Sequence, residues 1–176
     1  MGTVFPFLFR LRSQELTDRR FPNNDPATNR SISSCALNTI RIAAALLIRP
    51  DGQTLLVRKR GASAFMQPGG KIGPGETPDA ALARELREEI DLDVEPASFE
   101  VLGEFSAEAS NEPGHRVHAD VFLVRTEQVC FHPAAEIEEV KWVSPFDIDG
   151  VALAPLTADH IFPHYRELIG RSTRRR

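Results

Sequence analysis

The sequence predicts an α/β fold with a mixed β-sheet, and three observations support this prediction. Residues 40–60 and 98–124 contain apolar, β-branched runs that are interrupted by turn sequences. Residues 78–90 repeat apolar side chains every three to four positions, which is the period of an α-helix. A second helical pattern follows near the C-terminus, at residues 157–169. Strands and helices that alternate in this way favour one sheet with helices on both faces.

Each predicted element follows from local patterns. The first two strands flank Pro50-Asp51-Gly52, which is a strong turn signal. Alternation is clearest at residues 116–124, where Val117 and Val121 share one face and His118 the other. The predicted strands are, in order, 40–48, 53–60, 98–109, 116–124 and 138–143. The predicted helices are 78–90, 144–148 and 157–169, the last around Pro163.

A glycine-rich loop, residues 67–76, leads directly into the first predicted helix. Thr77 suits the N-cap position, and Pro78 suits the first helical residue. Glycines let the backbone turn tightly and bring its own polar groups close to a ligand. A phosphate-binding loop is therefore one interpretation, and a simple turn is the alternative.

Three glutamates lie on one side of this helix. Glu85, Glu88 and Glu89 stand at i, i+3 and i+4, which gathers them within about 100° of a helical wheel. Glu89 borders the apolar stripe, where an unpaired carboxylate is unfavourable. Arg84 and Arg87 fall elsewhere on the wheel, so we do not expect them to neutralise the cluster cleanly. A divalent cation with oxygen ligands would neutralise it, and a solvated acidic face is the alternative.

Together, the loop and the helix resemble the Nudix box, G-x5-E-x7-R-E-U-x-E-E-x-G-U, where U is a bulky aliphatic residue. The matching residues are Gly70, Glu76, Arg84, Glu85, Leu86, Glu88, Glu89 and Leu92. Asp91 departs from the pattern, because the family has its second glycine there. That position ends the helix in a left-handed conformation, which Asp tolerates better than most residues. The resemblance implies a Nudix-type α/β/α sandwich with a mixed β-sheet.

The resemblance also implies a metal site. Glu85, Glu88 and Glu89 would coordinate Mg²⁺ or Mn²⁺, and one of them would act as the general base. The carbonyl group of Gly69 would complete the metal shell. Relatives place a further ligand on a loop that corresponds to Glu136, for which an ion pair on the surface is the alternative.

Other residues of the box and its surroundings have implied roles of a different kind. Glu76 and Arg84 would form a structural ion pair between the loop and the helix. Phe65 could stack on a base, with burial in the core as the alternative. The predicted substrate-binding residues are Arg58, Arg60, Phe65, Gly70 and Lys71.

The implied reaction is attack of water on a phosphorus atom of a nucleoside diphosphate that is linked to another group. Residues 105–108 lack the proline that relatives acting on ADP-ribose carry. The downstream tyrosine of relatives acting on dinucleoside polyphosphates is also missing, since Tyr165 is the single tyrosine of the chain. By elimination, MutT-like hydrolysis of nucleoside triphosphates is the leading hypothesis. An ADP-ribose or nucleotide-sugar pyrophosphatase and a non-catalytic nucleotide-binding sensor are the alternatives.

The composition limits the possible binding partners and indicates the domain organisation. A net charge of −4 over 176 residues argues against stable nucleic-acid binding, and we expect a small nucleotide as the partner. Two cysteines form no disulfide framework, which fits the cytoplasm, and no apolar run is long enough to span a membrane. The oligomeric state stays open between monomer and homodimer. We expect a disordered extension at 1–38, a Nudix hydrolase domain at 39–170 and a basic tail at 171–176.

Overall fold

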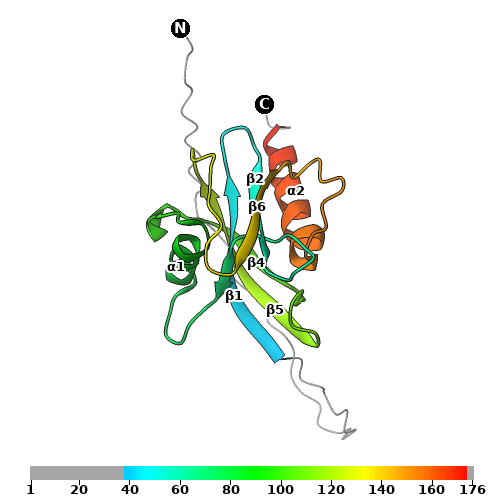
Figure 1. Cartoon of the computed structure of the whole chain (residues 1–176). Coiled ribbons are helices and arrows are strands. Elements are labelled where there is room, and N and C mark those ends of the chain that lie inside the picture. Colours follow the sequence, from blue (N-terminus) through cyan, green and yellow to red (C-terminus); the bar gives the residue numbers. More distant parts are fainter. Residues whose placement is uncertain (1–37, 174–176) are drawn as a thin grey trace, which may run out of the picture. The chain divides into compact units, whose positions relative to one another are not determined.

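A six-stranded mixed sheet organises the residues that the computed structural model describes, 38–173 (Figure 1). The strands are β1 (Asn38–Ile48), β2 (Thr54–Lys59), β3 (Gly69–Lys71), β4 (Glu100–Glu108), β5 (His115–Arg125) and β6 (Ile137–Val143). The helices are α1 (Pro78–Ile90), the 3₁₀ turn η1 (Pro96–Ser98), the π-helix η2 (Leu156–Ile161) and α2 (Phe162–Thr173). The predicted α/β fold is confirmed. The predicted N-terminal extension lies outside the described residues, apart from Asn38, which begins β1.

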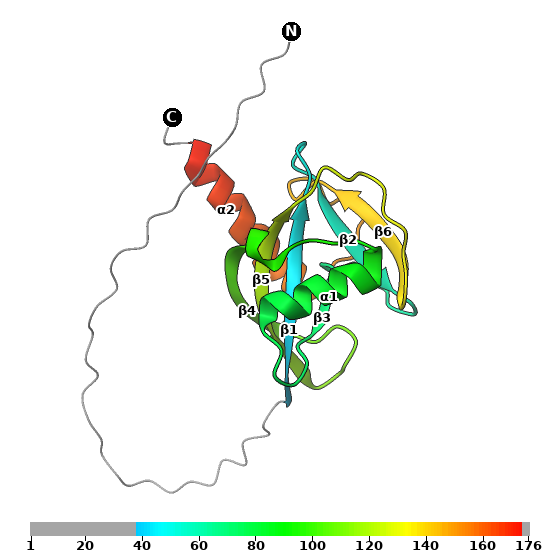
Figure 2. The same cartoon turned by 90° about the vertical axis from the view of Figure 1, so that its left-hand side faces the viewer.

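β1 is the central strand of the sheet, whose order is β4-β5-β1-β2-β6. It runs parallel to β5 over its whole length and antiparallel to β2 and β3. The short strand β3 pairs with β1 at Ile42–Ala44. The sheet is therefore mixed, and its central strand carries the glycine-rich segment along one edge (Figure 2).

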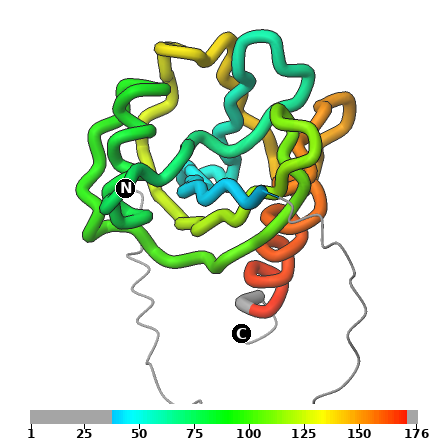
Figure 3. Tube along the Cα trace, turned by 90° about the horizontal axis from the view of Figure 1, so that it is seen from below, coloured from blue at the N-terminus to red at the C-terminus, as the bar shows by residue number. Residues whose placement is uncertain are grey.

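Both faces of the central strand are buried, in two separate apolar clusters. Ala43, Ala45 and Leu47 face the cluster that contains Leu82 and Leu86 of α1. The alternate residues of β1, together with Ile161 and Phe162, belong to the second cluster, under the C-terminal helices. Figure 3 shows β1 in the middle, with α1 and α2 on opposite sides. The helix α1 is thus fixed on the sheet by its apolar stripe.

Helix α1 begins and ends where the sequence predicts. Thr77 occupies the N-cap position with an extended backbone, although its side chain makes no cap hydrogen bond, and Pro78 is the first helical residue. Asp91 ends the helix in a left-handed conformation (φ 54°, ψ 40°). The N–H of Leu92 then donates to the carbonyl of Leu86 at 3.1 Å, which closes the last turn.

Three local features differ from the prediction. Residues 144–148 form a turn rather than a helix, because Asp147 N–H donates to the carbonyl of Ser144 at 3.1 Å. β3 was predicted as loop, and its three residues are strand because β1 offers them a free edge. The C-terminal helix starts as a π-helix just before Pro163 and continues to Thr173, into the predicted basic tail. A proline ring clashes with the carbonyl four residues earlier in a regular α-helix, and the wider π turn relieves this clash.

No helix among residues 38–173 combines the length and the apolar character that a membrane crossing requires.

Candidate active site

A cavity of about 840 Å³ lies beside the glycine-rich segment. The segment itself contributes Gly69, Gly70 and Lys71, and α1 contributes Glu85. Residues 108–113, which end β4 and begin the loop to β5, line another part of the wall. Ligand pockets of globular proteins are typically about 300–1,000 Å³, so the cavity has the size of a small-molecule site.

Both glycines of the segment make close contacts, and the backbone requires a glycine at Gly69. A Cβ atom on Gly69 would lie 2.2 Å from the carbonyl oxygen of Ala43, and its φ of 139° is unfavourable for other residues. A Cβ atom on Gly70 would lie 2.4 Å from the carboxyl group of Glu85. The backbone of this segment therefore packs directly on β1 on one side and on a glutamate of α1 on the other.

Glu89 is the buried member of the glutamate cluster, with 1% of its surface exposed. Its Oε2 accepts a hydrogen bond from Gly69 N–H at 2.9 Å. Its Oε1 has no hydrogen-bond partner, although Lys59 Nζ lies 3.4 Å away. Burial raises the pKa of Glu89 to about 7, and Lys59 and the Gly69 N–H offset only part of this effect. The position of Glu89 at the edge of the apolar stripe agrees with the helical wheel.

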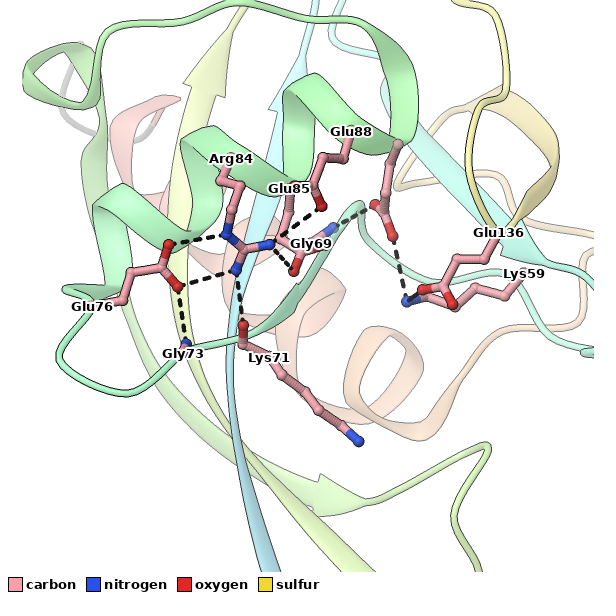
Figure 4. A network of polar contacts seen from close by, with 10 residues as sticks. Lys59, Gly69, Lys71, Gly73, Glu76, Arg84, Glu85, Glu88 and Glu136 are labelled. Carbon is pink, nitrogen blue, oxygen red and sulfur yellow. Dashed lines mark hydrogen bonds and ion pairs between the residues drawn. The ribbon is translucent and has the colours of Figure 1, made fainter.

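Arg84 joins the loop to the other two glutamates (Figure 4). Its guanidinium group contacts both carboxylate oxygens of Glu76 at 3.0 Å, so the ion pair expected between loop and helix is present in the structure. The same group donates to Glu85 at 2.8 Å, to Glu88 at 3.3 Å and to the carbonyl of Lys71 at 3.1 Å. Arg84 therefore neutralises two of the three glutamates, which is more than its position on the wheel suggested, whereas its guanidinium group makes no contact with Glu89. A helical wheel gives the direction of each Cα–Cβ bond but not the reach of a long side chain.

Lys59 connects the far end of the cluster to a third segment. It ends β2, and its ammonium group pairs with Glu89. The same group pairs with Glu136, which precedes β6 (Figure 4). From the sequence, Lys59 was expected only at the end of the second strand, between Arg58 and Arg60, as a contact of substrate phosphate or part of an exposed strand end, with no role beside the glutamates. Strand alternation predicts the direction of its side chain, because residues two apart lie on the same face of a sheet. Val57, two residues earlier, packs under α1, and Lys59 contacts the same helix.

Three of the predicted substrate-binding residues line the cavity: Arg60, Gly70 and Lys71. Lys71 also forms an ion pair of 2.8 Å with Glu112, which links β3 to the β4–β5 loop. Two flexible, partly exposed side chains are expected to separate easily when a competing anion is present. The cavity therefore offers cationic groups near its glycine wall.

The other two predicted substrate-binding residues have structural partners instead. Arg58 pairs with Glu138 and Glu139 of β6, each at 2.8 Å, and its guanidinium carbon lies 5.7 Å from the ring of Phe65. Phe65 is buried in the apolar cluster under α2. Neither residue lines the cavity, so their geometry favours a role in holding β2 and β6 together.

The acidic face of α1 fits a divalent cation. Glu85, Glu88, Glu89 and Glu136 supply the carboxylate oxygens that hard cations prefer, and Glu89 keeps one buried oxygen without a hydrogen bond. Among the described residues, no three acidic, histidine or cysteine side chains converge closely enough in this structure to hold a metal ion. Arg84 contacts the carboxylate of Glu85, and Lys59 contacts that of Glu89. The glycine-rich segment, Glu85 and the cavity thus lie together, as the predicted site requires.

Comparisons with known proteins identify the family. The NUDIX domain model matches residues 38–165. A Mycobacterium tuberculosis protein with the provisional name 8-oxo-dGTP diphosphatase 2 is 36% identical over 118 residues, which cover 61% of this chain and 82% of that protein. An RNA pyrophosphohydrolase of Marinomonas sp. is 43% identical over 58 residues, 33% of this chain and 35% of that protein. The crystal structure of a MutT protein from Methanosarcina mazei matches with a TM-score of 0.64 and 26% identity, over 77% of this chain and 99% of that one.

The chain belongs to the Nudix family and is a Nudix hydrolase. Members of this family generally use divalent metal ions and act on small nucleotide substrates.

Proposed function

We propose that the protein is a MutT-like pyrophosphohydrolase that cleaves a diphosphate bond in nucleoside triphosphates, with Mg²⁺ or Mn²⁺ as its cofactor. The observation that carries the proposal is the cavity, which brings Glu85 of α1 together with the Gly69–Lys71 segment. Similarity to a protein named for diphosphatase activity on 8-oxo-dGTP supports this substrate class.

Glu85, Glu88 and Glu89 are the proposed metal ligands, with the Gly69 carbonyl and Glu136 as further ligands. A bound ion of this kind would neutralise charge on the phosphate oxygens and make the attacking water more acidic. One of the three helix glutamates would accept the proton of that water. Glu85 is the helix glutamate that lines the cavity, so it lies beside the space that the substrate would fill.

The remaining residues would position the reactants. Arg84 holds Glu76, Glu85 and the carbonyl of Lys71 at once, so it fixes the loop relative to the helix. Lys71 and Arg60 line the cavity and would bind the phosphate chain. A pre-formed frame of this kind matters because small displacements of catalytic groups can reduce rates by about a hundredfold.

A substrate panel tests the proposal. The purified protein is incubated with Mg²⁺ or Mn²⁺ and with nucleoside triphosphates, 8-oxo-dGTP, ADP-ribose, nucleotide sugars or RNA carrying a 5′-triphosphate. We expect metal-dependent release of a nucleoside monophosphate and pyrophosphate from a nucleoside triphosphate. Glu89→Gln should abolish this release, and Asp159→Asn, on the exposed face of η2, serves as the control. Turnover of ADP-ribose or RNA alone would contradict the substrate class, and nucleotide binding without any turnover would indicate the sensor.

We further propose that the enzyme works in the cytoplasm, where the exposed, free thiol of Cys130 stays reduced. The alternatives of monomer and homodimer are decided by the molecular mass of the active fraction in solution.

A further inference from the structure

Lys59 lies where three segments of the active site meet. It ends β2, whereas Glu89 belongs to α1 and Glu136 to the loop before β6. Its ammonium group contacts the buried carboxylate of Glu89 at 3.4 Å. It also pairs with the exposed carboxylate of Glu136 (Figure 4). One cation thus bridges two carboxylates that come from segments far apart in the sequence.

The backbone holds these segments together independently of the ammonium group. The carbonyl of Glu136 accepts a hydrogen bond from Arg60 N–H at 2.8 Å. The carbonyl of Glu89 accepts one from Ala134 N–H at 2.9 Å. Lys59 is therefore not needed to bring the two carboxylates close, and its charge is free to serve another purpose.

We propose that the Lys59 ammonium group is a built-in counter-ion, which holds the place of the divalent cation at Glu89 and Glu136 and is displaced when that cation binds. This inference rests on the proposed function, because it takes Glu89 as a metal ligand. A Mg²⁺ ion lies about 2.1 Å from its oxygen ligands. An ion on Glu89 would thus come within about 5 to 6 Å of the ammonium group, where the two cations repel each other.

The structure also provides a destination for the displaced side chain. Lys59 lines the cavity, as do Arg60 and Lys71. A lysine side chain has four methylene groups and several rotatable bonds, so its ammonium group can turn from Glu89 towards the cavity. There it would add a positive charge beside the phosphates of a bound nucleotide. Metal binding and nucleotide binding would then strengthen each other, and linkage requires the effect to be reciprocal.

Metal affinity without nucleotide tests the exchange directly. Mg²⁺ is titrated by calorimetry into the wild-type protein and into Lys59→Met, which removes the charge but keeps an apolar stem. Lys141→Met, on the neighbouring strand β6, removes the same charge away from Glu89 and is the matched control. The titration is carried out at pH 8.5, because at lower pH a proton on Glu89 would take the place of the ammonium group that the variant lacks. We expect Lys59→Met to bind Mg²⁺ at least about tenfold more tightly, a difference of about 1.4 kcal/mol, and Lys141→Met to match the wild type.

A second measurement uses the unmodified chain, so that it does not depend on folding of the variant. The sequence contains three lysines, Lys59, Lys71 and Lys141, and their side-chain NMR signals can be assigned by substitution. Added Mg²⁺ should shift the Lys59 signal and leave that of Lys141 in place.

The outcomes separate this inference from the proposed function. Unchanged or weaker Mg²⁺ binding by Lys59→Met, or a Lys59 signal that stays fixed while Mg²⁺ binds and substrate is turned over, would overturn the counter-ion proposal alone. A wild-type protein that neither binds Mg²⁺ nor turns over any nucleotide would overturn both.

Discussion

Replacing Glu89 by Gln should change how the stability of the metal-free protein depends on pH. Glu89 is buried under α1, and burial raises its pKa from the ordinary 4.5 to about 7, despite the nearby Lys59 and the Gly69 N–H. Gln has nearly the same shape as a protonated Glu but does not titrate. The variant therefore isolates the energetic consequence of ionising this one side chain.

The sign and the size of the effect follow from linkage. Between pH 4.5 and 7 the folded protein keeps a proton on Glu89 that the unfolded chain has already lost. The free energy of unfolding must therefore fall as the pH rises through this window and level off above it. At about 1.4 kcal/mol per unit of pKa, the loss is about 3 kcal/mol. The stabilising contribution is complete below pH 4.5 and is lost above pH 7.

Urea denaturation in EDTA between pH 4.5 and 8 measures this effect. The difference in unfolding free energy between Glu89→Gln and the wild type should grow in favour of the variant by about 3 kcal/mol across the range. Asn111→Ala removes an exposed side chain that does not titrate and is the control, whose difference should stay level across the range. A level difference for Glu89→Gln as well would refute the conclusion that Glu89 is buried without sufficient compensation.

Three further substitutions test the site and its support. Gly70→Ala should reduce kcat/KM by about ten- to a hundredfold with little change in Tm, because the new methyl group pushes the flexible carboxyl group of Glu85 aside. Asp91→Gly should raise the free energy of unfolding by about 0.5–1 kcal/mol in urea denaturation, since glycine adopts the left-handed conformation freely. Thr157→Val should lower it by about 1–3 kcal/mol, because its buried hydroxyl donates to Gln67 at 2.7 Å and the amide would lose its partner.

Much of the fold was predictable because the elements obey local rules. Pro78 and Asp91 bound α1 where capping preferences place them, and its apolar stripe packs on the sheet. The strands of the β4–β5 pair follow from alternation and from the turn between them. The short strand β3 could not be predicted in this way, because a three-residue strand depends on the free edge of β1 and not on its own sequence. The turn at 144–148 is similar, since a five-residue helix is too short to be stable without tertiary support.

The positions of the proposed ligands on α1 were predictable from the sequence, whereas the cations that contact them were not. Periodicity alone places Glu89 at the edge of the core, since it depends only on the 3.6-residue repeat of α1. The contacts of Lys59 depend on how β2, α1 and the segment before β6 pack together. A local sequence pattern does not predict this packing. The same holds for Arg58, whose partners on β6 become visible only when the two strands pair.

Arg84 and Lys59, the two cations in contact with the glutamates of α1, bind their carboxylates with different geometries. Arg84 makes several directed hydrogen bonds to Glu76, Glu85 and the backbone, as a planar guanidinium group can, and so fixes the loop on the helix. Lys59 offers Glu89 a point charge at 3.4 Å without a well-directed hydrogen bond. A group bound in this way is easier to displace than a bidentate one. The N-terminal half of the cluster is therefore held by several directed bonds, whereas the buried half has the single charge of Lys59, which is the cation that our proposal requires to be exchangeable.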